Sequence, residues 1–155
     1  MLTSCIGKVE TSTNSDIVRV GQKLPLFEVT MNNGMTFKSS SLHEKASVII
    51  FFNTACIDCR KELLVVQKIY MDYGKYVHFL CISRAEEETS VNSYWKNNAL
   101  TLPYSAQETK DIYSLFATSI IPRVYISDKS GTIRECFSQK VSENQLRKAL
   151  NKVMQ

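Results

Sequence analysis

The sequence predicts an α/β domain with a central mixed β-sheet flanked by helices, and three observations support this prediction. Residues 47–53 form a continuous apolar, β-branched and aromatic run, which is typical of a strand buried on both faces of a parallel sheet. A helical pattern and a second strand follow this run, and such a crossover requires a parallel core. A hairpin pattern at residues 124–137 adds an antiparallel edge.

The composition agrees with one globular domain. The chain has 155 residues, of which 44% are hydrophobic and 22% charged, and it contains 5 glycines and 3 prolines. These values exclude a disordered, collagenous or coiled-coil chain. The net charge is +4, from 19 basic and 15 acidic residues, and it is spread along the chain. We therefore expect no nucleic-acid partner, because such partners favour basic residues clustered on one element.

The first 15 residues differ in composition from the rest of the chain. They are polar and lack periodicity, so we expect a flexible leader over residues 1–15 and a domain over residues 16–155. Leu2-Thr3-Ser4-Cys5 resembles the lipobox of bacterial lipoproteins, although the apolar segment that precedes a lipobox is missing. Two interpretations stay open: a chance match, or a natural start further upstream with Cys5 as a lipid attachment site.

The elements follow in order along the chain. A β-hairpin is expected first, with strands over 26–31 and 35–38 around the turn signal Asn32-Asn33-Gly34. Apolar spacing then predicts a helix over 57–73, which Gly74 ends. The remaining expected elements are a strand over 76–83, a helix opened by Glu86-Glu87-Glu88, a short helix over 108–117, strands over 123–127 and 132–137, and a helix over 143–154 capped by Ser142.

Two side-chain roles follow from these assignments. We expect the three glutamates at 86–88 to be solvated and to match the positive end of the helix dipole. We expect the single tryptophan, Trp95, to serve packing.

Five cysteines, at positions 5, 56, 59, 81 and 136, cannot all pair within one chain. Cys56 and Cys59 are separated by two residues and lie between the buried strand and the first helix. The N-terminus of a helix stabilises a thiolate through its unpaired N–H groups and its dipole. We therefore expect Cys56, exposed at the first turn, to attack disulfides. Cys59, one turn further on, then resolves the mixed disulfide.

Two structural cysteines, or half of a zinc site, are the alternatives for this pair. A zinc site needs two further ligands, and the candidates His43, His78, Cys81 and Cys136 form no second closely spaced pair. We therefore predict no metal, and no cofactor beyond a redox-active Cys56–Cys59 disulfide.

The chain resembles the thioredoxin superfamily. Within it, the chain is similar to the TlpA/ResA-like branch of cell-envelope thiol–disulfide oxidoreductases, which is related to the AhpC/TSA family. The resemblance covers about residues 18–153, and the matching segments are Val20–Phe27, Asn33-Gly34, Val48–Asn53, Cys56–Glu62, Ile120–Pro122 and Ile126–Gly131. It implies a thioredoxin-like fold with an extra N-terminal β-hairpin. It also implies a monomeric reductase of protein disulfides in the bacterial periplasm or envelope, recharged by a membrane electron donor.

The resemblance also implies roles for individual residues. Pro122 matches a cis-proline that lies against the cysteine pair, and a cis bond would let the backbone of Ile121 pair with an extended substrate peptide. An ordinary trans-proline is the alternative. Glu62 matches a glutamate near the active site and could carry the proton that Cys59 must lose, or it could be a solvated helix residue. Arg123 could contact substrate or be exposed.

Some residues depart from the family pattern. Ala55 stands where the family usually has tryptophan, Asp58 where proline is common, and Ile50 where thioredoxin has a buried acid. The resemblance also places the strands of Cys81 and Cys136 on opposite sides of the central strand, so we expect no bond between these two cysteines.

Two other functions remain as alternatives. A peroxiredoxin-like peroxidase needs a threonine three residues before its reactive cysteine, where this chain has Asn53, with Thr54 one place later. A non-enzymatic metal- or partner-binding module on a thioredoxin fold is the other alternative.

Overall fold

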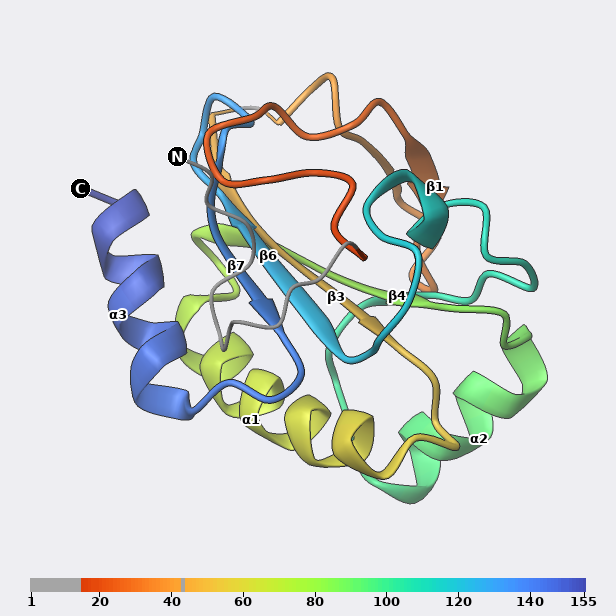
Figure 1. The fold of residues 1–155 in the computed structure, drawn as a ribbon. Coiled ribbons are helices and arrows are strands. Elements are labelled where there is room, and N and C mark those ends of the chain that lie inside the picture. Colours follow the sequence, from red (N-terminus) through yellow and green to blue (C-terminus); the bar gives the residue numbers. More distant parts are fainter. Residues whose placement is uncertain (1–14, 43) are drawn as a thin grey trace.

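A five-stranded mixed sheet forms the centre of the computed structural model, which describes residues 15–42 and 44–155. The strand order is β5-β4-β3-β6-β7, in which β4 and β5 run parallel to β3 whereas β6 and β7 form an antiparallel edge (Figure 1). The strands are β3 (Ala46–Phe52), β4 (Val77–Ser83), β5 (Tyr104–Ser105), β6 (Arg123–Ser127) and β7 (Ile133–Ser138). The predicted α/β class, the mixed sheet and its antiparallel edge are confirmed.

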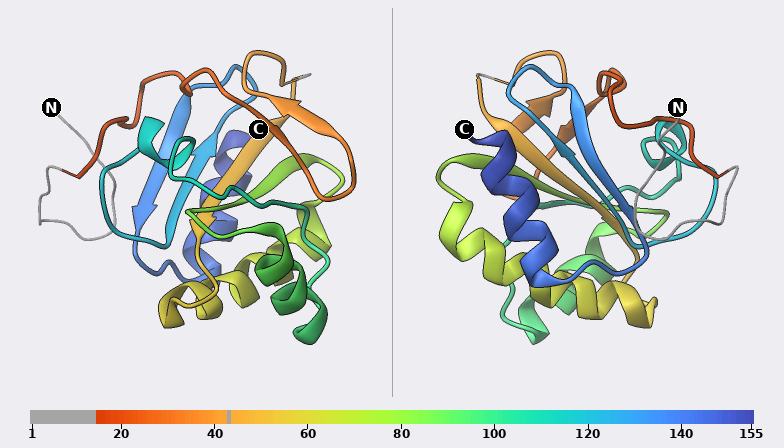
Figure 2. Two further views of the ribbon diagram at one scale, coloured as in Figure 1. Left: turned by 90° about the vertical axis from the view of Figure 1, so that its right-hand side faces the viewer. Right: turned by 60° about the vertical axis from the view of Figure 1, so that its left-hand side comes forward.

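Helices cover one face of this sheet. They are α1 (Ile57–Tyr73), α2 (Glu88–Asn97) and α3 (Glu143–Val153), and Figure 2 shows α1 and α3 lying side by side. Arg147 of α3 contributes to this pairing, because its guanidinium lies 2.8 Å from the carboxylate of Asp72 on α1. Ser142 caps α3 as predicted, with its side chain accepting the N–H of Gln145.

The other face carries the N-terminal hairpin and a short 3-10 helix, η1 (Tyr113–Leu115). The hairpin consists of β1 (Glu28–Thr30) and β2 (Thr36–Lys38) and forms a separate two-stranded sheet. Its turn contains Gly34 at φ 89°, a conformation that glycine adopts without steric cost. The extra hairpin is therefore confirmed, with strands shorter than the sequence predicted.

Strand β3 is buried along its whole length, as its apolar run predicts. Successive side chains of a strand point to opposite faces, so β3 divides between two core layers. Ile50 and Phe52 pack beneath the helices, whereas Ile49 and Phe51 pack beneath the hairpin and η1. The loop that leaves β3 is therefore held from both sides as it enters α1.

Three elements differ from the predicted ones. The helix expected over 108–117 is reduced to η1, and the short strand β5 was not anticipated. The second helix begins at Glu88, because Ala85 has a left-handed backbone (φ 57°) and Glu87 is the N-cap. Within the described residues, no helix has both the length and the apolar character needed to cross a membrane.

Candidate functional site

The cysteine pair lies where β3 passes into α1. Cys56 is the N-cap of α1, and its Sγ accepts a hydrogen bond from the N–H of Cys59 at 3.1 Å. The N-terminal N–H groups of a helix have no partner within the helix, so this position favours negative charge on sulfur. Cys56 is half-buried, whereas Cys59 is completely buried, and both are free thiols. The structure thus gives an accessible sulfur and a protected sulfur one turn apart.

The segment before β6 completes the surroundings of Cys56. The Ile121–Pro122 peptide bond is cis, as the family resemblance implied, and the Ile121 carbonyl oxygen lies 4.0 Å from Cys56 Sγ. Strand β6 is the antiparallel neighbour of β3, with Arg123 opposite Phe51. This pairing explains why segments 65 residues apart in the chain meet at the attacking sulfur.

Burial distinguishes the two thiols. Desolvation raises the pKa of the Cys59 thiol well above its ordinary value, and the contact with Cys56 raises it further, while the charge of Arg84 acts in the opposite direction. Cys59 therefore holds its proton until a base removes it. That requirement matters because only the thiolate can attack a disulfide.

Glu62 is the ionisable group one turn beyond Cys59 on α1. It is 1% exposed, so the alternative of a solvated helix residue is excluded. One carboxylate oxygen accepts the N–H of Val141 at 3.0 Å, and the other has no hydrogen-bond partner among the described residues. Burial raises the pKa of Glu62 to about 7, although the Val141 hydrogen bond and the charge of Lys140 oppose the shift. A carboxyl group with this pKa can accept or release a proton near neutral pH.

Glu86 is a site residue that the sequence prediction missed. The expectation of a solvated first-turn glutamate is wrong for it, because its carboxylate accepts hydrogen bonds from the N–H and the hydroxyl of Thr54. Arg60 Nε donates to the carbonyl of Thr54 at 2.6 Å, and Ser90 donates to Glu86. Glu86 and Arg60 thus hold the backbone of Thr54 in the loop that carries Cys56, and Ser90 positions the Glu86 carboxylate.

The topology contained a signal for this contact. Strands β3 and β4 are parallel neighbours, so the segments that follow them leave the sheet at the same edge. Thr54 follows β3 by two residues and Glu86 follows β4 by three. A hydroxyl and a carboxylate at this edge were therefore candidates for an interaction.

The structure corrects both expectations for Arg123. Its side chain is completely buried and cannot contact substrate, contrary to one of the two expectations, and it is not exposed either. The guanidinium lies 2.7 Å from the carboxylate of Asp16 and donates to Ser15 and to the carbonyl of Ser119. Arg123 is thus a structural group that ties Ser15 and Asp16 to the segment before Pro122.

The surface around Cys56 is mainly apolar. Ile57 is 66% exposed directly after the cysteine, and Ile120 is 38% exposed on the neighbouring segment. At the edge of this surface, Asp58 and Lys140 face each other at 4.0 Å. Ala55, where the family usually has tryptophan, is also exposed beside Cys56.

The remaining candidates have structural positions. Cys81 is a buried free thiol on β4, and Cys136 is buried on β7, two strands from the central β3 on the other side, so the expectation of no bond between them is confirmed. His78 Nε2 lies 2.9 Å from the carbonyl of Leu42. Trp95 is buried and packs against Phe52, as expected for a packing role. Cys5 and His43 lie outside the described residues.

The described part of the chain contains no group of three or more histidine, cysteine, aspartate or glutamate side chains that could hold a metal ion.

Comparison with known proteins agrees with this site. A profile of the AhpC/TSA family matches residues 20–136. A thiol–disulfide oxidoreductase ResA of Bacillus cereus is 25% identical over 137 residues, which cover 88% of this chain and 79% of ResA.

Solved structures extend the comparison to the fold. The solution structure of a candidate protein disulfide isomerase from Bacteroides thetaiotaomicron has a TM-score of 0.83 at 26% identity and covers 90% of this chain and 92% of that chain. The exposed lipoprotein thioredoxin Etrx1 of Streptococcus pneumoniae strain TIGR4 has a TM-score of 0.70 at 17% identity, over 83% and 99% of the two chains, which shows the fold alone.

The fold and the site together define a thioredoxin-like α/β protein with a cysteine pair at the start of a helix. The family match covers well over half of the chain, and the chain therefore belongs to the AhpC/TSA family. It is also a distant homologue of the ResA thiol–disulfide oxidoreductases.

Proposed function

We propose that this chain reduces disulfide bonds of cell-envelope proteins through the Cys56–Cys59 couple. The observation that carries the proposal is the position of Cys56: its half-buried Sγ caps α1, accepts the Cys59 N–H at 3.1 Å and lies 4.0 Å from the Ile121 carbonyl. The similarity to ResA supports this assignment of chemistry.

The reaction proceeds by two thiol–disulfide exchanges. The Cys56 thiolate attacks one sulfur of the substrate disulfide, whose S–S bond breaks as the mixed disulfide forms, and the released substrate thiolate takes up a proton. Cys59 then transfers its proton to Glu62 and attacks Cys56 Sγ. This second step forms the Cys56–Cys59 disulfide and breaks the mixed disulfide, and the second substrate sulfur leaves as a thiolate that takes up a proton. The substrate gains two electrons, and the couple is oxidised.

Burial supports the assignment of these roles. Cys59 has no exposed surface, so an incoming protein disulfide reaches only Cys56. The substrate segment lies in extended conformation along the backbone of Ile121 and against Ile57 and Ile120. Pro122 is buried beneath this segment, and its carbonyl oxygen accepts the N–H of Gln139 at 2.8 Å.

The partners and the location are part of the same proposal. A membrane electron donor recharges the oxidised couple, and the monomeric domain works in the bacterial periplasm or on the envelope, with lipidated Cys5 as a further anchor. An exposed lipoprotein thioredoxin is among the proteins that share the fold. Fractionation of cells into membrane, periplasmic and cytoplasmic pools tests the location, and recovery only in the cytoplasmic pool contradicts it.

Insulin reduction with dithiothreitol as electron donor tests the chemistry. We expect the chain to accelerate insulin precipitation and Cys56→Ser to abolish the acceleration. Cys81→Ala is the matched control, because Cys81 is a free buried thiol outside the pair and its loss leaves the reaction intact. Equal rates for the parent and for Cys56→Ser contradict the proposal. Peroxide consumption faster than that of a free thiol favours the peroxidase alternative instead.

A further inference from the structure

Half of strand β4 has no neighbouring strand on its outer side. Strand β3 pairs with all of β4, whereas β5 pairs only with Cys81 and Ile82. Among the described residues, no strand continues the sheet beside residues 77–80. An unpaired edge of this kind presents backbone N–H and C=O groups that can pair with another chain.

The outward-facing backbone groups belong to Val77 and Phe79. The N–H of Cys81 donates to the Pro103 carbonyl at 3.3 Å, on the side of β5. Successive residues of a strand direct their backbone groups to alternate sides, so the residues two and four places before Cys81 face the same side. The backbone N–H and C=O groups of Val77 and Phe79 therefore remain available for hydrogen bonds on this edge.

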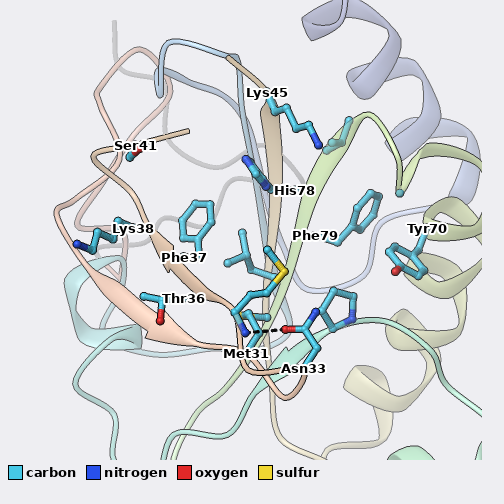
Figure 3. Close-up of a pocket in the computed structure, with 15 residues that line it drawn as sticks. Met31, Asn33, Thr36, Phe37, Lys38, Ser41, Lys45, Tyr70, His78 and Phe79 are labelled. Carbon is cyan, nitrogen blue, oxygen red and sulfur yellow. Dashed lines mark hydrogen bonds between the residues drawn. The ribbon is translucent and has the colours of Figure 1, made fainter. Parts of the chain in front are cut away.

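The edge forms the floor of a cavity of about 540 Å³, which we call the edge groove. One wall is the β1–β2 hairpin with Phe37, and the other is the C-terminal part of α1 with Tyr70 (Figure 3). The ring centroids of Phe37 and His78 lie 5.3 Å apart, as do those of Tyr70 and Phe79. Aromatic packing thus holds both walls against the strand.

The length of the groove is bounded at one end. Asn32 and Tyr104 close it there, because the Asn32 N–H donates to the Tyr104 carbonyl at 2.7 Å and the Tyr104 N–H donates to Asn32 Oδ1 at 2.9 Å. Lys45 lies toward the other end, away from Asn33 (Figure 3). Four residues of strand span about 13 Å, which suits a short extended segment of similar length.

The lining is basic. It contains Lys38 and Lys45, both exposed, and no aspartate or glutamate. Neither lysine forms a salt bridge within the described part of the chain, and Glu28, which faces Lys38 across the hairpin, is not among the lining residues. This charge favours an acidic occupant over a basic one.

We propose that the edge groove binds an extended, acidic segment of a partner protein, which adds as a strand beside Val77–Leu80. Main-chain hydrogen bonds to the open edge hold such a segment, and the lysines select its charge. A second copy of this chain fits poorly, because the hairpin and α1 stand on either side of the edge and admit one strand rather than a sheet. Two copies would also bring their lysines together.

The groove is separate from the cysteine pair. Ser83, at the end of β4, lies opposite Phe52 beside the pair, whereas Val77 lies opposite Ala46 at the other end of the sheet. Six residues of strand correspond to about 20 Å. The edge groove is therefore a second binding surface, whose occupancy is independent of thiol chemistry.

An NMR titration of the full chain with two synthetic pentapeptides tests the proposal. One peptide alternates glutamate with valine and the other alternates lysine with valine, and both have blocked termini. We expect the glutamate peptide to shift the amide signals of Val77–Leu80 and to slow hydrogen exchange there. Lys45→Glu weakens its binding about threefold to fivefold, the scale of an exposed ion pair. The matched control Lys96→Glu, on exposed α2 surface, leaves binding within about twofold.

A second variant tests the groove itself. Thr36 is exposed on β2 and lines the groove, so Thr36→Trp fills it without altering the core and abolishes binding. Equal shifts with the two peptides, shifts confined to the surroundings of Cys56, or unchanged binding to Thr36→Trp each overturn the proposal. A concentration-dependent shift of the Val77–Leu80 signals without peptide assigns the edge to a second copy and also overturns it.

Discussion

At alkaline pH the Glu62→Gln variant should be more stable than the parent chain. At acidic pH the two should differ little in stability. The Glu62 carboxyl is 1% exposed, and one of its oxygens has no partner among the described residues. Burial raises its pKa from an ordinary 4.5 to about 7 in the folded chain. Ionising this group inside the protein therefore costs folding free energy, which the neutral glutamine avoids.

The direction in which stability changes with pH follows from proton binding by the folded and the unfolded chain. Between pH 4.5 and pH 7 the folded chain binds the Glu62 proton and the unfolded chain does not, so stability falls as pH rises through this window. The difference between the two pKa values corresponds to about 3 kcal/mol in full, and to about 2.5 kcal/mol between pH 5 and pH 8. Glu62→Gln removes this pH-dependent loss.

Urea unfolding of the parent and the variant at pH 5 and pH 8 measures the effect. The stability difference between Glu62→Gln and the parent should change by about 2.5 kcal/mol in favour of the variant at pH 8. Comparing the same pair at two pH values cancels the constant cost of the unpaired amide. Glu108→Gln, on exposed surface, should show no such change. If the stability difference between variant and parent changes by less than about 0.5 kcal/mol from pH 5 to pH 8, the reasoning for a buried titrating carboxyl at this position is refuted.

Three further outcomes are expected. Glu86→Ala should slow insulin reduction about tenfold because the loop of Cys56 loses its clamp. Glu86→Gln, which keeps an acceptor for the Thr54 N–H, should retain most activity, and equal loss in both variants contradicts the clamp. Cys59→Ser should accumulate a covalent adduct with a disulfide peptide, visible by mass spectrometry and absent in Cys56→Ser; no adduct in either variant contradicts the assigned roles. Arg123→Met should lower the free energy of unfolding by about 3 kcal/mol, because it removes the buried ion pair with Asp16 and the hydrogen bonds to Ser15 and to the Ser119 carbonyl. Denaturant unfolding measures this loss, and an unchanged midpoint rules it out.

The elements that the sequence predicted well are those whose signal is local. The apolar run of β3 and the spacing of α1 depend on neighbours in the chain, and both elements appear close to their predicted bounds. The helix expected over 108–117 failed because only Tyr113–Leu115 close helical turns, while Phe116 and Ala117 turn inward to the core. Packing against the sheet thus outweighed a weak helical pattern.

The residues of the candidate site also differ in how far the local sequence predicts their roles. The role of Cys56 follows from its place before a helix, which the sequence contains. Glu86 and Arg123 were misjudged because their partners are distant in sequence: Glu86 meets Thr54 across 32 residues and Arg123 meets Asp16 across 107. A charged residue with no nearby partner in the sequence looks solvated, and only the sheet order shows which segment neutralises it.

The arrangement of Cys59 and Glu62 joins catalysis to stability. Resolution of the mixed disulfide requires that a thiol buried from water lose its proton, so its acceptor must also be inside the protein. A solvated carboxylate with an ordinary pKa is too weak a base at neutral pH, whereas burial of Glu62 brings its pKa to about 7. The same burial destabilises the fold above that pH. The stability gained by Glu62→Gln at pH 8 and the slower resolution expected of that variant are therefore two results of one physical cause, and a variant that gains stability without slowing resolution would separate Glu62 from the proton transfer.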